Sequence, residues 1–165
     1  GGERVSIARR GARHDEADVP VTLTRHQSRE AALQVLYQSE IGKIPIDLAF
    51  ETFDRPKSDP PQREFATWLA RGTAAHLTEI DQLITGSSQH WRLSRMAVVD
   101  RLIIRIAVFE FLYRCEDELT PRAVVINEAL ELARTFSDDK AVAFVNGVLD
   151  DIRQRLDAEN RSSVS

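Results

Sequence analysis

The feature that most constrains the fold is a segment near the middle of the chain, MAVVDRLIIRIAVFEFLY (residues 96–113). Read as a helix, it is apolar on nearly every side, a pattern typical of a central helix that other helices surround. Four charged residues interrupt it: Asp100, Arg101, Arg105 and Glu110. It is too short and too charged to be a membrane span. The segment therefore predicts one buried helix at the centre of an all-α protein.

The stretch RHQSREAALQVLYQSEI (residues 25–41) predicts an amphipathic helix with basic residues in its first turns. Its apolar residues recur at helical spacing. Thr24 suits the N-cap, and Gly42 suits the position that ends the last turn. Arg25 and Arg29 lie one turn apart, close to the free N–H groups and the positive end of the helix dipole, where anions are favoured.

Helical patterns also fill most of the remaining chain. Residues 61–86 predict one long helix or two shorter ones, with Gly72 in the stretch where a bend would fall. The one strand-like run, Ala-Val-Val-Ile at 123–126, follows a Thr-Pro pair that favours a helix start. Ser137 suits the N-cap of the last helix. The predicted helices outside the centre are 25–41, 46–53, 61–86, 120–136 and 137–156, so the fold class is all-α, a compact bundle of about seven helices.

The ends of the chain differ from its middle in composition. Residues 1–23 are polar, contain Gly and Pro, and show no sustained periodicity, so we expect a flexible, partly basic extension. We expect one helical domain over residues 24–157 and a disordered tail over 158–165. The chain shows no signal-peptide core and no membrane span, so we expect a cytoplasmic protein.

The net charge of −4 hides an asymmetry between the start of the chain and the rest. Residues 1–29 contain six Arg and four acidic residues, for +2, so the remaining chain carries −6. A small basic arm on an acidic body suits an anionic partner, with RNA as the leading candidate, although a solvated tail would have the same composition. The arginines of the arm include Arg9, Arg10 and Arg13.

The usual sequence patterns of enzymes and metal sites are absent. The four His residues are widely separated, and none lies in a zinc-binding arrangement. There is no phosphate-binding loop and no nucleophile elbow. The single Cys115 excludes an internal disulfide and has no neighbouring base to activate it. We therefore expect a protein that is not an enzyme and binds no metal or cofactor.

The charges in the central helix need partners. A buried Arg requires a carboxylate or backbone carbonyls, so Arg105 is expected to form an internal ion pair with Glu128 or Glu131. Asp100 and Arg101 lie nearer the start of the helix and are expected to face a partner protein.

The last helix contains an unusual pair, Asn146 and Gly147, in FVNGVLDDI (residues 144–152). Glycine in a helix interior is less favourable than alanine by about 1 kcal/mol. A helix that keeps this pair in its interior is therefore expected to gain something from it. We expect Gly147 to allow a neighbouring helix to approach closely and Asn146 to bond to an adjacent segment.

Several of these segments together resemble the NusB family of bacterial transcription antitermination proteins. The resemblance covers most of residues 25–153 and is carried by SREAALQVLYQ (28–38), VVDRLIIRIAVFEF (98–111) and TPRAVVINEALELARTFSDDKAVAFVNGVLDDI (120–152). INEALELA and FVNGVLD occur in order and at the spacing of the family, which makes the match specific.

The resemblance implies an all-helical fold of two packed helical subdomains and no catalysis. NusB-like proteins bind boxA, a short single-stranded element of ribosomal RNA leaders, together with NusE, a small-subunit ribosomal protein. The complex acts with RNA polymerase to resist Rho-dependent termination. An acidic body suits such a basic ribosomal protein partner. Asp100 and Arg101, with the acidic residues of 120–131, are the residues we expect at the NusE face.

By family position, Arg25 and Arg29 form the start of the RNA-binding surface. The family usually has a denser arginine run there, whereas this chain places His26, Gln27 and Ser28 between the two arginines. The last helix adds the charge of Lys140 and the ring of Phe144, and single-stranded RNA is usually bound by phosphate contacts and by bases stacked on aromatic rings. The expected RNA-contacting residues are Arg25, Arg29, Lys140, Phe144, Arg9, Arg10 and Arg13, with Phe136 and Phe144 also compatible with the core.

Two other functions fit the same resemblance. The chain could be the NusB-like RNA-binding domain of an rRNA cytosine methyltransferase, which would require a longer chain with a cofactor-binding Rossmann-like domain. It could also be a homodimeric helical interaction module, because some family members self-associate.

Overall fold

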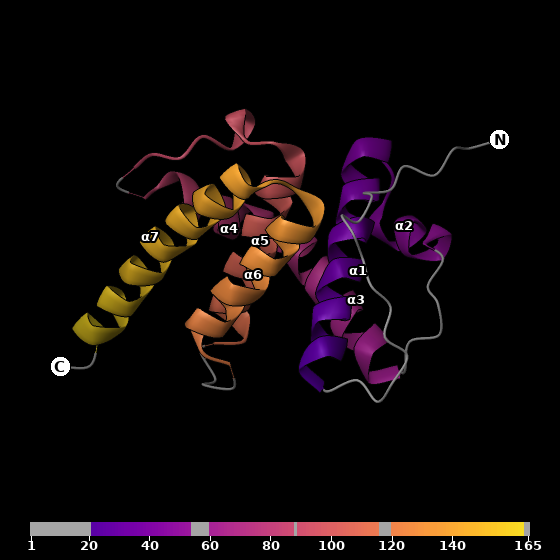
Figure 1. Ribbon diagram of the computed structural model, residues 1–165, viewed down its shortest axis with the longest axis horizontal. Coiled ribbons are helices and arrows are strands. Elements are labelled where there is room, and N and C mark those ends of the chain that lie inside the picture. The colour runs from indigo at the N-terminus through magenta and orange to yellow at the C-terminus, as the bar shows by residue number, and fades with distance from the viewer. Residues whose placement is uncertain (1–20, 54–59, 88, 116–119, 164–165) are drawn as a thin grey trace.

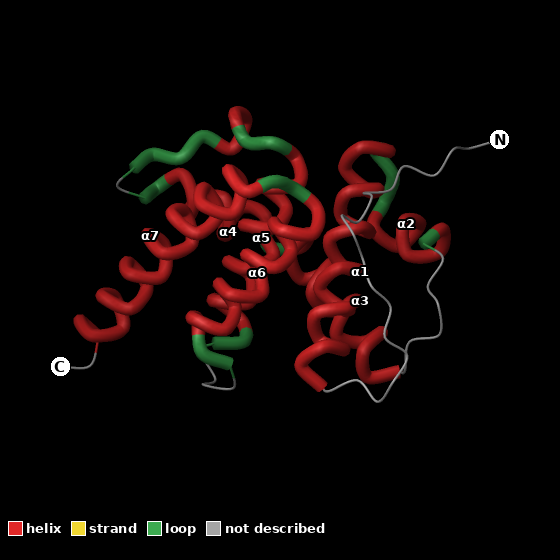
Figure 2. Tube along the Cα trace, in the orientation of Figure 1, coloured by secondary structure: helices red, strands yellow, loops and turns green. Residues whose placement is uncertain are grey.

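The computed structural model describes residues 21–53, 60–87, 89–115 and 120–163 of the chain. Within these residues it contains α-helices, one short 3-10 helix and no strand (Figure 2). The prediction of an all-α fold with about seven helices is confirmed. None of the described helices is long and apolar enough to cross a membrane. The elements are α1 (Val21–Gly42), α2 (Ile46–Thr52), α3 (Pro60–Ala75), α4 (Leu77–Thr85), η1 (Leu93–Arg95), α5 (Val98–Tyr113), α6 (Arg122–Phe136) and α7 (Asp139–Ser163).

The helices form two groups that share α5 as their common support (Figure 1). In the first group α1 packs along α3, with α2 across them, and in the second group α6 and α7 pack against each other and against α5. Because α5 contacts α1, α3, α4, α6 and α7, its side chains are enclosed from most directions. Residues 102–104 and 106–111 are all buried, which confirms the predicted central helix.

The boundaries of the first and last helices differ from the prediction. Helix α1 begins at Val21, so Thr24 is inside the helix and is not its N-cap. Gly42 is still helical, and Lys43 takes the left-handed backbone conformation with φ of 52°. The N–H of Ile44 donates to the carbonyl of Ser39 at 3.1 Å, which closes the helix end. Helix α7 continues to Ser163, past the predicted end of the folded domain at residue 157.

The caps of the C-terminal helices also fall on other residues than predicted. The carboxylate of Asp138, and not the hydroxyl of Ser137, accepts the N–H of Ala141 at 2.8 Å and caps α7. Thr120 does not cap α6, because its hydroxyl accepts a hydrogen bond from Nε of Arg114 at 2.8 Å. Ser, Thr and Asp are similar in capping preference, so composition alone does not separate adjacent candidates.

The close packing expected at Gly147 occurs instead at Gly72. A Cβ at Gly72 would lie 2.0 Å from Cζ of Phe109, so α3 and α5 can approach only because this residue has no side chain. Helix α3 runs through Gly72, and the break before α4 falls at His76. At Gly147 a Cβ would meet nothing within 4 Å, and Asn146 beside it is exposed. The expected internal packing of this pair was therefore wrong.

We expect Gly72→Ala to lower the free energy of unfolding by about 1–3 kcal/mol, because the added methyl group collides with the buried Phe109 ring. Gly147→Ala is the matched control, and we expect it to raise the free energy of unfolding by about 0.5–1 kcal/mol, because alanine is the better helix former. Urea unfolding followed by circular dichroism measures both. A stabilised Gly72→Ala variant would contradict the packing described.

Candidate nucleic-acid interface

Arg29, expected at an RNA-binding surface, forms a buried ion pair. Its Nε and one terminal nitrogen donate to the two carboxylate oxygens of Glu110 at 3.0 and 2.8 Å. The residue is only 4% exposed, and Glu128 lies 3.6 Å from its remaining terminal nitrogen. Although burial acts to lower it, the bonds to Glu110 hold the pKa of Arg29 above its usual value. The prediction that Arg29 faces phosphates is wrong in this structure, because its guanidinium is enclosed and neutralised.

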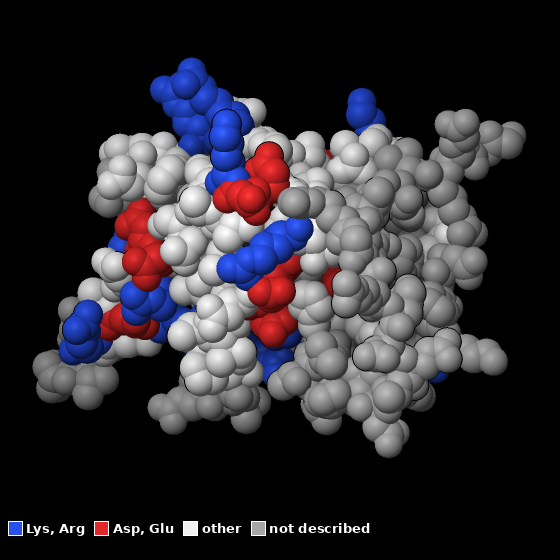
Figure 3. Space-filling view, in the orientation of Figure 1, with Lys and Arg blue, Asp and Glu red and all other residues white. Residues whose placement is uncertain are grey.

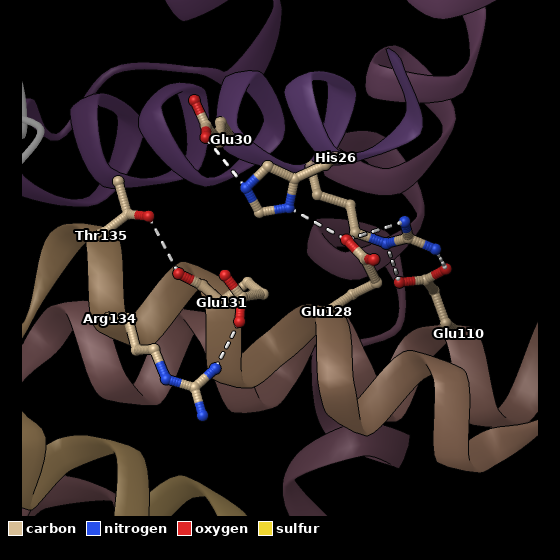
Figure 4. Close-up of polar contacts among 8 residues, drawn as sticks. His26, Glu30, Glu110, Glu128, Glu131, Arg134 and Thr135 are labelled. Atoms are coloured by element: carbon tan, nitrogen blue, oxygen red, sulfur yellow. Dashed lines mark hydrogen bonds and ion pairs between the residues drawn. The ribbon is translucent and has the colours of Figure 1, made fainter. Parts of the chain in front are cut away.

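His26 extends this buried pair into a network that joins α1 to α6 (Figure 4). Its Nδ1 lies 2.9 Å from Glu128, and its Nε2 lies 3.0 Å from Glu30. The hydrogen bond with Glu128, followed by that with Glu30, raises the pKa of His26 to about 9. The bond to His26 in turn lowers the pKa of Glu128. At neutral pH His26 is therefore a cation that bridges two carboxylates.

Arg25 remains near the surface, where it lies over an aromatic ring. Its guanidinium carbon is 4.0 Å from the centre of the Phe65 ring, and the guanidinium carbon of Arg114 is 4.8 Å from the same centre. Arg25 and Arg114 are both half-buried. We call Arg25, Phe65 and Arg114 the arginine patch. Burial lowers the pKa of Arg114, and the nearby charges of Arg29 and Arg25 add to this effect, while Glu110 opposes it.

The residues expected at a partner-protein face are engaged inside the molecule. Asp100 is only 9% exposed, and its burial raises the pKa of the carboxyl, against a hydrogen bond with Ser137 that lowers it. Arg101 donates to Glu40 of α1 at 2.9 Å. The prediction that Asp100 and Arg101 face a partner is therefore not supported by their placement, because α5 is covered at its start as well as at its centre.

Arg105 forms the expected kind of ion pair with an unexpected partner. It donates through two nitrogens to the two carboxylate oxygens of Asp81 in α4, both at 2.9 Å. Neither predicted partner is used, because Glu128 pairs with His26, and Glu131 pairs with Arg134 one turn along α6 (Figure 4). The class of interaction was predictable from burial, but the partner depends on how α4 packs against α5.

At the start of α7, Lys140 and Phe144 lie on one face beside a tryptophan. Lys140 is exposed and Phe144 is half-buried. The Phe144 ring meets the Trp91 ring edge to face, with centroids 5.6 Å apart. Trp91 is held in place by its indole N–H, which donates to Asp151 at 3.2 Å. Phe136, the other aromatic candidate, is buried in the core.

Two basic residues missed by the sequence reasoning lie next to this aromatic pair. Arg92 directly precedes η1 and Arg95 is its last residue, and both are exposed. Figure 3 shows Lys and Arg side chains projecting over η1 and the start of α7, with acidic side chains beside them. We call Trp91, Phe144, Lys140, Arg92 and Arg95 the aromatic–basic patch. Its one sequence signal is the run HWRLSR, which places aromatic and basic residues together before the central helix.

The predicted residues thus fall on two separate surfaces. The first turns of α1 and the first turns of α7 lie at opposite ends of the bundle (Figure 1). Arg25 belongs to the first surface, and Lys140 and Phe144 belong to the second. Arg9, Arg10 and Arg13 lie outside the residues that the structure describes.

The described residues offer no arrangement for metal binding or thiol chemistry. No group of His, Cys, Asp and Glu side chains in the described ranges could hold a metal ion. Burial, followed by the charge of Glu110, raises the pKa of Cys115 to about 11, so its thiol is protonated at neutral pH.

Comparisons with known proteins agree on one family. The model of the NusB family matches residues 26–154. The transcription antitermination protein NusB of Koribacter versatilis is 45% identical over 142 residues, which cover 85% of this chain and 95% of that protein. The protein of the same name from Desulforamulus reducens is 46% identical over 126 residues, covering 76% of this chain and 86% of that protein.

Solved structures give the same result. T. maritima NusB has a TM-score of 0.71 and 32% identity, covering 79% of this chain and 90% of that one. A chain from the crystal structure of antitermination factors NusB and NusE in complex with double-stranded RNA has a TM-score of 0.67 and 26% identity. The match covers 81% of this chain and 98% of that one.

The buried pair generates a first prediction for this site. We expect Arg29→Met to lower the free energy of unfolding by about 3–5 kcal/mol, because it leaves the carboxylate of Glu110 buried without its main partner. Arg29→Met combined with Glu110→Leu should recover most of that loss, because both charges are gone. Arg71→Met, which breaks the exposed pair with Asp47, should change stability by less than about 1 kcal/mol. Equal losses in the single and double variants would show that the pair itself is not the cause.

A second prediction concerns pH. The pKa of His26 is raised from 6.5 to about 9 on folding, so its ion pairs contribute fully below pH 6.5 and are lost as the pH rises to about 9. Stability should therefore fall between these values, and His26→Gln should remove that part of the slope. Urea unfolding across this range, for wild type and variant in parallel, measures the difference. Identical slopes would show that His26 is not charged in the folded protein.

Proposed function

The chain belongs to the NusB family, and from that membership we infer that it is an RNA-binding transcription antitermination factor. The observation that carries this inference is the family match across the helical body, residues 26–154. Its RNA ligand is a boxA-type single strand in ribosomal RNA leaders, its protein partner is a NusE-type ribosomal protein, and together they act on RNA polymerase. The protein performs no catalysis, requires no cofactor, and works in the cytoplasm where transcription takes place.

The aromatic–basic patch has the chemistry that single-stranded RNA requires. Bases stack on aromatic faces, and phosphates pair with nearby cations. Phe144 and Trp91 supply rings that are only partly covered by the core, and Lys140 lies one turn from Phe144 on the same helix. Arg92 and Arg95 add two charges beside Trp91. This combination supports the proposal that Lys140 and Phe144 contact the RNA.

The arginine patch contributes differently. Arg25 is near the surface and can reach a phosphate, whereas Arg29 acts from below by fixing α1 against α5. Arg29 is thus a positioning residue for Arg25. Arg9, Arg10 and Arg13 precede α1 in the chain, and we propose that they contribute further phosphate contacts.

The experiment is a fluorescence-anisotropy titration of boxA-like RNA, with and without the NusE-type protein, against a scrambled RNA. We expect preferential binding that tightens when the partner is added. Arg92→Ala with Arg95→Ala should flatten the dependence of log K on log salt by about 1.4, which is about 0.7 for each lost phosphate contact. Phe144→Leu, which keeps an apolar side chain, should weaken binding about tenfold by removing a stacking face.

The control is Arg161→Ala, which removes an exposed charge at the far end of α7. It should leave both the affinity and the salt slope close to wild type. Equal binding of the boxA-like and scrambled RNAs in both conditions would refute the proposed function. If only the variants of the aromatic–basic patch bind like wild type, the RNA contacts a different surface of the protein.

A further inference from the structure

An open cleft of about 930 Å³ lies between α3 and α5, next to the junction of α3 and α4. We call it the aromatic cleft, and its walls and floor are Trp68, Gly72, His76, Phe109 and Tyr113. Trp68 and Tyr113 are 39% and 38% exposed, so two large aromatic side chains face the cleft and solvent. Exposed apolar surface of this kind commonly marks a binding site.

The rings of the cleft form a continuous surface. The centroid of Phe109 lies 4.7 Å from that of Trp68 and 5.1 Å from that of Tyr113. The Phe109 ring can lie this close to α3 only because Gly72 has no side chain, as described above. Phe109 is buried and both neighbouring rings are tilted against it, so Trp68 and Tyr113 are the aromatic faces that a planar ring could contact from solvent.

Polar atoms at one side of the cleft are oriented by the protein. Nδ1 of His76 lies 2.8 Å from the carbonyl of Gly72. A carbonyl only accepts, so Nδ1 carries a proton, and in the tautomer with that single proton Nε2 is an acceptor. The hydroxyl of Tyr113 donates to Glu79 at 2.6 Å. These groups can accept hydrogen bonds from a ring that carries N–H donors at its edge.

The α3 edge of the cleft carries two arginines and one glutamate. Arg63 and Arg71 both line it, and a rise of eight residue steps along the helix separates them by about 12 Å. Arg71 pairs with Asp47, but the two side chains are 58% and 70% exposed, so this pair is weak and exchangeable. Glu64 also lines the cleft, next to Arg63, and Glu79 lies at the other side, where it accepts the bond from Tyr113.

The cleft lies next to the arginine patch. Phe65, which lies beneath Arg25, stacks on Trp68 with centroids 6.1 Å apart and planes at 21°. A strand bound at Arg25 would therefore meet Trp68 next. Phe65 is itself buried, so the two sites on α3 are linked by this ring contact beneath the surface.

We propose that the aromatic cleft binds a base of the single-stranded RNA that flanks the segment bound at the arginine patch, with Arg63 and Arg71 contacting its phosphates. This rests on the proposed function and extends it. Trp68 and Tyr113 stack on the base, Phe109 forms the floor, and the arginine edge holds the backbone. The cleft thereby lengthens the RNA footprint beyond the boxA-type element.

The test uses a short boxA-like oligonucleotide and two extended RNAs, in which single-stranded nucleotides are added at the 5′ end or at the 3′ end. The chain contains two tryptophans, so the full protein labelled with 5-fluorotryptophan gives two ¹⁹F resonances, which Trp68→Phe assigns. We expect one of the extended RNAs to shift the Trp68 resonance, whereas the short RNA shifts it little. That extended RNA should also bind about fivefold more tightly than the short one.

Arg63→Ala with Arg71→Ala should remove that advantage and leave binding of the short RNA unchanged, whereas Arg161→Ala should keep it. If all the RNAs bind equally and none moves the Trp68 resonance, the cleft proposal is wrong and the proposed function stands. If no RNA binds, the cleft proposal and the proposed function are both wrong. If the NusE-type protein moves the Trp68 resonance and RNA does not, the cleft is a protein-binding site and the proposal is also wrong.

Discussion

The buried ion pair between Arg29 and Glu110 is the interaction on which the rest of the structure depends. It joins α1 of the first helix group to α5, the helix that supports both groups. Two enclosed charges are tolerated only when they satisfy one another with good geometry, and the two-nitrogen bond achieves this. Because the pair has a single geometry, it fixes how far α1 is rotated and shifted against α5. The positions of Arg25 and His26, one turn earlier, follow from it.

A second ionic network holds the other end of α1. Glu40 accepts from Arg101 at 2.9 Å and lies 3.7 Å from Arg105, which itself pairs with Asp81 of α4. Helix α1 is thus attached to α5 at both ends by charges that interrupt an otherwise apolar segment. This explains why the central helix carries arginines and acids at all: they set the register between helices that apolar packing alone would leave less defined. The same pairing removes Arg101 from any partner surface.

The sequence predicted those parts of the structure that depend on local pattern. Periodicity placed the helices, and the nearly all-round apolar character of residues 96–113 identified the central one. Pairings between distant residues were not accessible in the same way. Arg29 looked like a surface cation because its neighbours His26 and Ser28 are polar, yet Glu110, 81 residues away, encloses it. Likewise, nothing in the immediate sequence distinguishes Gly72, which a ring contacts, from Gly147, which faces open space.

The charge distribution then limits how RNA can be bound. The chain is acidic as a whole, so a phosphate backbone gains little from the average field and must rely on local clusters of cations. The clusters that remain near the surface each lie beside aromatic rings: Arg25 over Phe65, and Lys140 one turn from Phe144. Stacking contributes affinity that does not depend on net charge, and a ring also holds a guanidinium in place by cation–π attraction. An acidic body with aromatic–cationic sites can therefore bind a single strand and still attract a basic protein partner to its remaining surface.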